Sequence, residues 1–396
     1  MERIIMHIDV NNAFLSWTAV DLLEKGYPID IRAIEAIIGG DKTKRSGIVL
    51  AKSPPAKKKG VVTAETIYSA KKKCPNLKMF PPNYHMYKEK SISLFKLLSK
   101  YTPDIEVASI DECYLDYGKI KKLYGNELEF AKKIQSEIYD TLKFTVNIGI
   151  ANNKLCAKMA SDFSKPNKIH TLYDYEVKEK MFPLPIEDLF GVGKQTSSKL
   201  RAIGIHTIGD LASKPEQNLR RVFKNQASYL IRIANGIDNS EVDNATWIPK
   251  GISHEITLKE DTTSKTELYK YLRDLSEMLA KRIRKENKYA STICVILKDN
   301  TFKRYSHQKK LKNPISSYSE IYKYSKDVLD AFYNNEPIRL IGVRLDNLKE
   351  EKTYQTSLFD KESKNDEKLD KIMDTINNKY GKNVIKRATY IERDRF

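Results

Sequence analysis

Residues 109–116 read SIDECYLD, and residues 4–9 read IIMHID. In both stretches acidic side chains lie beside apolar ones: Asp111 and Glu112 fall between apolar positions, and Asp9 ends an apolar run. Residues 4–10 predict a short buried strand, and residues 105–117 predict two strands around a tight turn that carries the Asp-Glu pair. The sequence therefore places carboxylates at the ends of strands that belong to a core.

Carboxylates in such places are costly unless a cation or a hydrogen-bond donor compensates them. Three acids brought together, Asp9, Asp111 and Glu112, would repel one another, and a pair of divalent cations would relieve the repulsion. The result would be a two-metal site for phosphoryl transfer. Oxygen ligands favour Mg²⁺ or Mn²⁺. In the alternative interpretation, Asp111 caps a turn and Glu112 is a solvated surface acid.

The composition points to a polyanionic partner. The 396 residues include 70 Lys plus Arg and 52 Asp plus Glu, which gives a net charge of +18. Nucleic acid or an anionic membrane surface would suit that charge. The alternative is that a lysine-rich composition reflects only the codon bias of the source. With 40% hydrophobic residues, the chain can bury cores and is not an acidic or wholly disordered protein.

Nothing in the sequence predicts a membrane span or a signal peptide, because no run of about 18 apolar residues occurs and the N-terminus lacks a basic-then-apolar pattern. The four cysteines are scattered without CxxC spacing. This pattern argues against a zinc site or a disulfide framework and fits a reducing cytoplasm. We therefore expect a cytoplasmic protein with no membrane partner.

The order of expected elements favours an α+β fold. Helices are predicted over 13–23, 85–101 and 127–142, and strands over 48–51 and 144–150, without a regular βα repeat. Residues 185–240 read as short helices punctuated by glycines. From 254 onward the order is strand 254–258, helix 267–285, strand 292–298, helix 319–333 and strand 338–345, which suggests a split-βαβ domain. Beyond residue 349 the chain is charged and reads as a tail.

Four stretches resemble one family in its own motif order. SIDECYLD at 109–116 closely resembles a signature of the Y-family translesion DNA polymerases, and HIDVNNAF at 7–14 resembles their first palm motif. NIGIANNK at 147–154 resembles the strand-turn element of the same palm, and KMASDFSKPN at 158–167 resembles the family's KPN element. The resemblance, of the DNA polymerase IV or UmuC-like type, covers roughly residues 4–348.

This resemblance implies a right-hand polymerase with an α+β palm, fingers, a helix-hairpin-helix thumb and a split-βαβ little finger domain. We expect the parts at these boundaries: palm 1–25 and 83–172, fingers 26–82, thumb 173–240, linker 241–249, little finger 250–348 and tail 349–396.

The resemblance also implies roles for single residues. Asp9, Asp111 and Glu112 match the catalytic, metal-binding carboxylates, and the backbone carbonyl of Val10 would join them. Phe14 falls at the aromatic steric gate, where a ring beneath the sugar would clash with a ribose 2′-hydroxyl; without the motif it would read as a core residue.

Two lysines are expected to bind the nucleotide. Lys165 matches the lysine that meets the triphosphate, where a cation offsets developing charge, although on composition alone it is an ordinary surface lysine. Lys57 matches the arginine of the finger segment but loses the bidentate fork of a guanidinium.

The chain also departs from the family. Asn11 stands where a second aspartate is common, and Pro54 replaces a tyrosine that contacts phosphate. Lys52 or Ser53 are the candidates to compensate for that lost hydroxyl.

Two further segments suggest partners. Gly191, Gly193 and Lys194 lie in a predicted helix-hairpin-helix, whose glycines let the backbone approach a DNA phosphate; the alternative is a plain turn between helices. In the tail, Gln355, Leu358 and Phe359 resemble the QxxLF peptide that docks on the β subunit of the bacterial sliding clamp; the alternative is an apolar patch that folds back on the protein.

We therefore expect a monomeric, Mg²⁺-dependent (or Mn²⁺-dependent) DNA-directed DNA polymerase. It would add dNTPs to the 3′-hydroxyl of primer-template DNA with low fidelity and without proofreading. One alternative is a catalytically silent relative that binds DNA and the clamp as a regulatory protein. Another is a helix-hairpin-helix nuclease.

Overall fold

The computed structural model describes residues 3–40, 47–245, 249–350, 363–381 and 384–385. The chain forms two compact units that divide between residues 246 and 247, and each is treated by itself below. Among the described residues, no helix combines the length and apolar character needed to cross a membrane.

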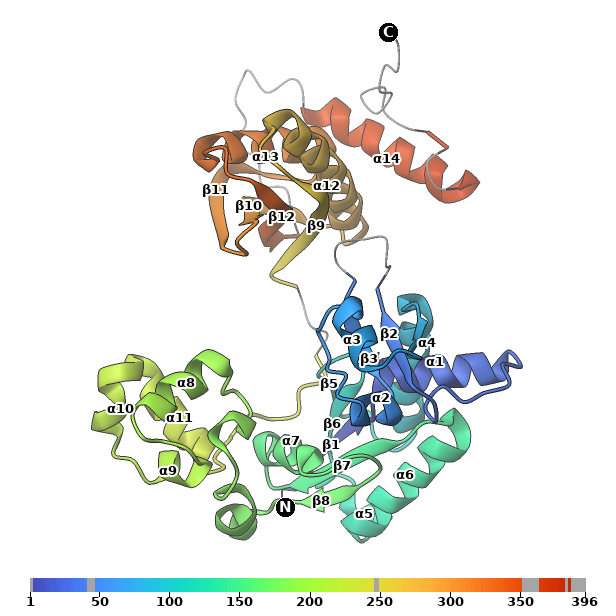
Figure 1. The fold of residues 1–396 in the computed structure, drawn as a ribbon, viewed down its shortest axis with the longest axis vertical. Coiled ribbons are helices and arrows are strands. Elements are labelled where there is room, and N and C mark those ends of the chain that lie inside the picture. The colour runs from blue at the N-terminus through green and yellow to red at the C-terminus, as the bar shows by residue number, and fades with distance from the viewer. Residues whose placement is uncertain (1–2, 41–46, 246–248, 351–362, 382–383, 386–396) are drawn as a thin grey trace. The chain divides into compact units, whose positions relative to one another are not determined.

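A five-stranded sheet forms the centre of the first unit, in the order β5-β6-β1-β7-β8. Its strands are β1 (Ile5–Val10), β5 (Ile105–Val107), β6 (Glu112–Asp116), β7 (Val146–Ala151) and β8 (Ile169–Thr171). The central strand β1 is antiparallel to both β6 and β7, while β8 runs parallel to β7. The strands predicted around residues 4–10 and 105–117 are thus direct neighbours in space (Figure 1).

The two faces of this sheet differ, because alternate side chains of a strand point to opposite faces. One face, with Met6, Ile8 and Val10 of β1, packs against the helices α4 (Tyr84–Leu98) and α6 (Glu127–Leu142). The other face carries His7 and Asp9 and is covered by α7 (Lys154–Asp162), which packs on β7 and β1. The polar positions of β1 therefore lie under one helix.

A second, smaller sheet has the order β3-β2-β4. Its strands are β2 (Ala36–Gly39), β3 (Val49–Lys52) and β4 (Lys78–Phe80), accompanied by α2 (Pro54–Lys58) and α3 (Ile67–Lys73). The helix α1 (Ala13–Glu24) packs against β2 and β3, and α5 (Lys121–Tyr124) precedes α6.

Short helices follow α7 along the chain. They are α8 (Lys194–Ala202), α9 (Ile208–Ala212), α10 (Glu216–Phe223) and α11 (Ala227–Ala234), with single helical turns at 174–176, 177–181, 186–188 and 224–226. Their apolar side chains, such as Leu200, Leu211 and Leu230, join those of α7 in one hydrophobic cluster. The glycine-punctuated stretch of the sequence is thus a compact helical subdomain.

The second unit is a four-stranded antiparallel sheet in the order β11-β10-β12-β9, packed against two helices. Along the chain the elements are β9 (Gly251–Thr262), α12 (Lys265–Lys285), β10 (Tyr289–Asp299), β11 (Arg304–Ile315), α13 (Tyr318–Phe332) and β12 (Ile338–Lys349). Apolar side chains of α12 and α13 meet those of the strands in a single core. A further helix, α14 (Ser363–Tyr380), packs on α13.

The α+β class is confirmed, but the sequence did not predict β11. This strand lies at the edge of its sheet, and most of its residues are exposed. Lysines, histidine and polar residues fill it, so it lacks the apolar alternation of a half-buried strand. Charged residues on an edge strand also discourage pairing with other chains.

Gly149 allows α7 to lie unusually close to β7. A Cβ atom at this position would lie 2.0 Å from the carbonyl oxygen of Ala157 and 2.5 Å from the amide nitrogen of Ser161. Both are backbone atoms of the helix and have no side-chain freedom with which to move away. The close approach brings the side chains of α7 down onto His7 and Asp9.

We predict that Gly149→Ala destabilises the first unit by about 3 kcal/mol or more, because α7 must move away from the sheet. Gly193→Ala is the matched control, since a Cβ there meets no atom within 4 Å. The free energy of unfolding, measured in urea, should fall only for Gly149→Ala. Equal stability of the two variants would contradict the packing described here.

Candidate active site

The register of three strands brings polar side chains into one row. Asp9 of β1 lies opposite Glu112 of β6 on one side and opposite Asn147 of β7 on the other. Because residues directly opposite in antiparallel strands share a face, all three side chains point toward α7. Asp111 precedes β6, and its carbonyl oxygen accepts a hydrogen bond from the amide of Val10 at 3.0 Å. The backbones of the three predicted acids are thus neighbours.

A lysine ammonium lies where these carboxylates converge. Nζ of Lys158, on α7, is 3.3 Å from Oδ2 of Asp9, 3.1 Å from Oε1 of Glu112 and 3.3 Å from Oδ2 of Asp162. Asp9 and Lys158 are only 6% and 8% exposed. Lys165 also contributes, with Nζ at 2.9 Å from Oδ1 of Asp9. The paired acids are therefore held around a positive charge supplied by the chain itself.

The electrostatics of the group follow from burial and these contacts. Burial raises the pKa of the Asp9 carboxyl, although Lys165 and Lys158 act in the opposite direction. Contact with His7 and the charge of Lys158 hold the pKa of Glu112 far below its usual range. Burial alone would lower the pKa of Lys158, but the surrounding carboxylates raise it above its usual value. Near neutral pH, Lys158 is therefore a cation and Glu112 an anion.

The ring of His7 lies against the carboxylate of Glu112. The ring is fully buried, with Nε2 at 3.3 Å from Oε2 of Glu112 and Nδ1 at 2.8 Å from Oγ of Ser161. Burial lowers the pKa of His7, so the ring is neutral at neutral pH. The hydroxyl of Ser161 donates its proton to the carbonyl oxygen of Lys158 at 2.8 Å.

The side chain of Asp111 does not join this group. Its Oδ1 accepts a hydrogen bond from the hydroxyl of Ser109 at 2.7 Å. In the described parts of the chain, no three histidine, cysteine or acidic side chains are gathered as ligands of one metal ion. The carboxylates of Asp9 and Glu112 nevertheless fit a cation between them, because an ammonium already lies there.

Phe14 belongs to an aromatic cluster at the start of α1. Its ring stacks on that of Tyr87, with centroids 4.6 Å apart and planes 8° from parallel, and meets Tyr84 edge-on at 6.1 Å. The hydroxyls of Tyr87 and Thr18 lie 2.9 Å apart. Phe14 itself is half-buried. The predicted gate residue thus has a ring whose orientation is fixed from two sides.

The residues predicted for the fingers, Lys52, Ser53, Pro54 and Lys57, are distributed between β3 and α2. Lys57 is exposed on α2. The pKa of Lys52, at the end of β3, is lowered mainly by the partial burial of Lys52 and secondly by the positive charge of Lys57. Ser53 is fully buried, and its hydroxyl accepts hydrogen bonds from the amides of Ala36 and Ala56. Ser53 therefore caps α2 and does not compensate for the tyrosine hydroxyl that Pro54 lacks.

The predicted helix-hairpin-helix glycines lie directly before α8. Gly191 adopts a left-handed φ of 92°, and Gly193 is the residue before the first turn of α8, which begins at Lys194. Gln355, Leu358 and Phe359 lie outside the described residues.

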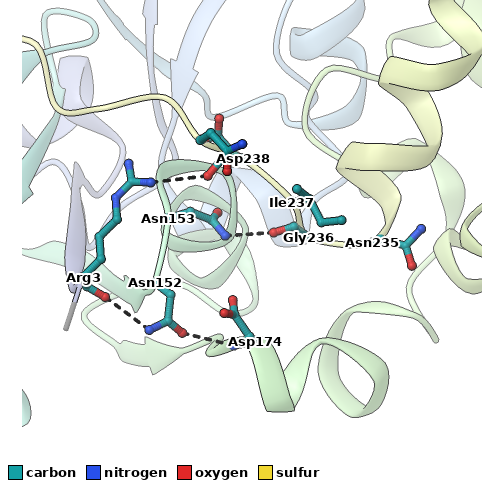
Figure 2. A pocket seen from close by; sticks show the side chains of 9 residues that line it. Arg3, Asn152, Asn153, Asp174, Asn235, Gly236, Ile237 and Asp238 are labelled. Carbon is teal, nitrogen blue, oxygen red and sulfur yellow. Dashed lines mark hydrogen bonds between the residues drawn. The ribbon is translucent and has the colours of Figure 1, made fainter.

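A polar hollow of about 530 Å³ lies where the chain leaves α11 and passes the start of α7. Figure 2 shows that Arg3 and Asn153 reach backbone carbonyls of Asp238 and Gly236 in that segment. Oδ2 of Asp238 in turn accepts a hydrogen bond from the amide of Leu155 in the first turn of α7. The sequence did not suggest this hollow, whose contacts hold the N-terminal end of α7 in place.

The sequence did not predict a role for His7 or Lys158, although they belong to the motifs at 7–14 and 158–167. A signal was present: in β1, polar residues occur at two positions, 7 and 9, of an otherwise apolar strand. That spacing predicts a polar row on one face.

Two family models match most of this chain, and proteins similar to it in sequence match over nearly its whole length. Residues 8–162 match the impB/mucB/samB family, and residues 249–358 match the C-terminal domain of that family. DNA polymerase IV of Clostridium acetobutylicum is 47% identical over 396 residues, which span 100% of both chains. DNA polymerase IV 1 of Bacillus subtilis is 33% identical, over 99% of this chain and 94% of that protein.

Solved structures of Y-family DNA polymerases have a similar fold. A Y-family DNA polymerase chimera built from Dbh and Dpo4 superimposes with a TM-score of 0.76 at 28% identity, over 87% of this chain and 99% of that one. An insertion ternary complex of Dbh DNA polymerase superimposes with a TM-score of 0.60 at 30% identity, over the same shares.

We predict that Lys158→Met lowers the stability of the metal-free protein by about 3 kcal/mol, because it removes the cation beside Glu112 and leaves the buried Asp9 with Lys165 alone. Millimolar Mn²⁺ should then raise the melting temperature more in the variant than in the parent, since one ammonium fewer competes for the carboxylates. Lys132→Met, at an exposed lysine on α6, is the control. Identical melting of parent and Lys158→Met in EDTA would show that Lys158 does not compensate these acids.

Proposed function

The chain belongs to the impB/mucB/samB family of Y-family DNA polymerases, and from that premise we propose a two-metal, low-fidelity mechanism for its site. As a member of this family it is a DNA-directed DNA polymerase of the translesion type. The observation that supports the proposed site most directly is the register of Asp9 opposite Glu112, with a cation held between the two carboxylates.

Asp9, Asp111 and Glu112, with the backbone carbonyl of Val10, are the groups proposed to hold Mg²⁺, or Mn²⁺ in its place. Their oxygens are of the type that such hard cations prefer. When bound, two such ions would activate the primer 3′-hydroxyl and stabilise the charge on the pyrophosphate that leaves. The chain's own contribution is to hold Asp9 and Glu112 in register and to supply Lys158 as a counter-cation beforehand.

Two lysines are proposed to bind the incoming dNTP. Lys165 extends from the loop after α7 and pairs with Asp9 and Asp162. When a nucleotide binds, the ammonium of Lys165 would leave these carboxylates and pair with a triphosphate oxygen. Lys57 on α2 adds a second positive charge. Phe14 would lie beneath the sugar, where its stacking on Tyr87 keeps the ring from turning aside.

Primer-template DNA is the proposed macromolecular partner. We assign residues 1–25 and 83–172 to the palm, 26–82 to the fingers, 173–240 to the thumb, 250–348 to the little finger and 349–396 to the tail. Gly191, Gly193 and Lys194 would approach a backbone phosphate at the start of α8. The exposed lysines of β11, including Lys309, Lys310 and Lys312, suit contacts to the duplex backbone.

The remaining parts of the proposal concern context. Gln355, Leu358 and Phe359 would dock on the sliding clamp and hold the monomeric polymerase on DNA. The sequence has no spare acidic cluster that resembles a proofreading exonuclease, so synthesis would proceed without proofreading and with low fidelity. The four cysteines are free thiols, as suits the cytoplasm, where we propose that the protein acts.

We predict that the double variant Asp111→Ala, Glu112→Ala loses primer extension by at least about 1,000-fold, because several kcal/mol of transition-state stabilisation depend on the metal ligands. The assay is single-nucleotide extension of a labelled primer with Mg²⁺. Asp116→Ala, at the far end of β6, should extend normally. Undiminished extension by the double variant would refute the proposed site.

A second prediction concerns sugar selection. Phe14→Ala should raise ribonucleotide incorporation relative to deoxynucleotide incorporation by roughly 10- to 100-fold, since the ring that would clash with the 2′-hydroxyl is removed. The ratio of kcat/KM for a ribonucleotide and its deoxynucleotide measures this. Phe95→Ala, a half-buried phenylalanine of the same unit, controls for lost packing. An unchanged ratio would remove Phe14 from the role of gate.

A further inference from the structure

The loop between α7 and β8 carries Lys165 and is held to the sheet by two asparagines. Asn147 is fully buried in β7, and Asn11, which follows β1, is 5% exposed. Their side-chain amides bond to each other and to the backbone on both sides of Lys165.

Four hydrogen bonds fix the orientation of the Asn147 amide. Its Nδ2 donates to the carbonyl oxygens of Ser161 at 2.9 Å and Ser164 at 2.6 Å. Its Oδ1 accepts from the amide of Lys168 at 3.1 Å and from Asn11 at 3.0 Å. Reversing the amide would put an oxygen against two carbonyls and an NH₂ group against an N–H, so only one orientation is possible.

The orientation of Asn147 dictates what position 11 must offer. A donor is required there, because Oδ1 of Asn147 faces it, and Nδ2 of Asn11 supplies that donor. An acceptor is required as well, because the amide of Asn167 points at position 11, and Oδ1 of Asn11 accepts from it at 2.8 Å. A carboxylate of the same shape would fail the first requirement, since it has no proton to donate and would repel Oδ1 of Asn147.

The bonded backbone groups flank Lys165 closely. The carbonyl of Ser164 lies just before it, and the amides of Asn167 and Lys168 follow within three residues. The loop is therefore fixed at both ends, and Nζ of Lys165 lies 2.9 Å from both Oδ1 of Asp9 and Oδ1 of Asp162. The residues from 164 to 168 are themselves exposed, and a backbone hydrogen bond from the amide of Ile148 to the carbonyl oxygen of Lys168 adds to the asparagine contacts.

We propose that Asn11 and Asn147 form an amide lock that positions Lys165 for the triphosphate of the incoming nucleotide. The inference rests on the proposed function, which gives Lys165 that role. The lock acts through the loop backbone and not on the nucleotide itself, so its two members are positioning residues. Because a triphosphate contact is made before and during the reaction, loss of the lock should act mainly on the KM for dNTP rather than on kcat.

Two variants of Asn11 test the lock. Asn11→Ala removes the acceptor of the Asn167 amide, and Asn11→Asp sets a carboxylate against Oδ1 of Asn147. Amide hydrogen exchange, measured by NMR on the protein without metal or DNA, should quicken about tenfold at Asn167 in the first variant and at Lys168 in the second. The KM for dNTP should rise about tenfold in both, with kcat changed less than threefold.

A double-mutant cycle shows whether the rise in KM for Asn11→Asp comes from its contact with Asn147. In an Asn147→Ser background, Oδ1 is absent and a hydroxyl is able to donate to a carboxylate at position 11. Asn11→Asp should then change the KM less than twofold. An equal effect in both backgrounds would mean that the added charge, not the amide pair, is responsible, and would overturn the proposal. Asn218→Asp, at an exposed site on α10, controls for the substitution.

Lys165→Ala separates this inference from its premise. If it raises the KM for dNTP while the Asn11 variants leave the KM unchanged, the amide lock is only structural. The positioning role of Asn11 and Asn147 is then rejected, and the triphosphate role of Lys165 is kept. Quickened exchange with an unchanged KM would overturn the inference in the same way. If Lys165→Ala itself leaves the KM unchanged, Lys165 does not bind the triphosphate, and both the premise and the inference fall.

Discussion

Two carboxylates on neighbouring strands, Asp9 and Glu112, point to the same covered face of a sheet, and that placement requires a cation. Like charges so close repel each other strongly, and burial of Asp9 strengthens the repulsion. Lys158 supplies the compensation from the helix above, at 3.3 and 3.1 Å. Gly149 allows that helix to lie close enough, because any Cβ would collide with its backbone. Gly149 and Lys158 together therefore place α7 over this pair.

The same helix connects the acids to the loop of Lys165, which is proposed to bind the nucleotide. Ser161 contacts His7, which supports Glu112, and the carbonyl of Ser161 also accepts from Asn147. Asp162, one residue later, pairs with both Lys158 and Lys165. Under the proposed function, the ammonium groups of Lys158 and Lys165 compensate the acids in the metal-free protein, Asp9 and Glu112 would hold divalent ions instead, and Lys165 would then pair with the triphosphate.

Much of this could be predicted from the sequence, because it depends on local pattern and on motif. The helix predicted over 127–142 coincides with α6, and the apolar runs around Asp9 and Glu112 predicted the strands β1 and β6, although not their pairing. The strand β11 could not be found, since an exposed edge strand needs no apolar alternation. The contact of Lys158 with Asp9 and the Asn11–Asn147 pair could not be predicted either, because each joins residues more than 100 positions apart. Only the register of the sheet brings such residues together.

The most direct test is to locate Mn²⁺ by anomalous diffraction in crystals of the protein with primer-template DNA and a non-hydrolysable dNTP. We expect manganese bound to carboxylate oxygens of both Asp9 and Glu112, with the ammonium of Lys158 moved away from them. Manganese bound elsewhere, or Lys158 still bridging the two carboxylates, would contradict it.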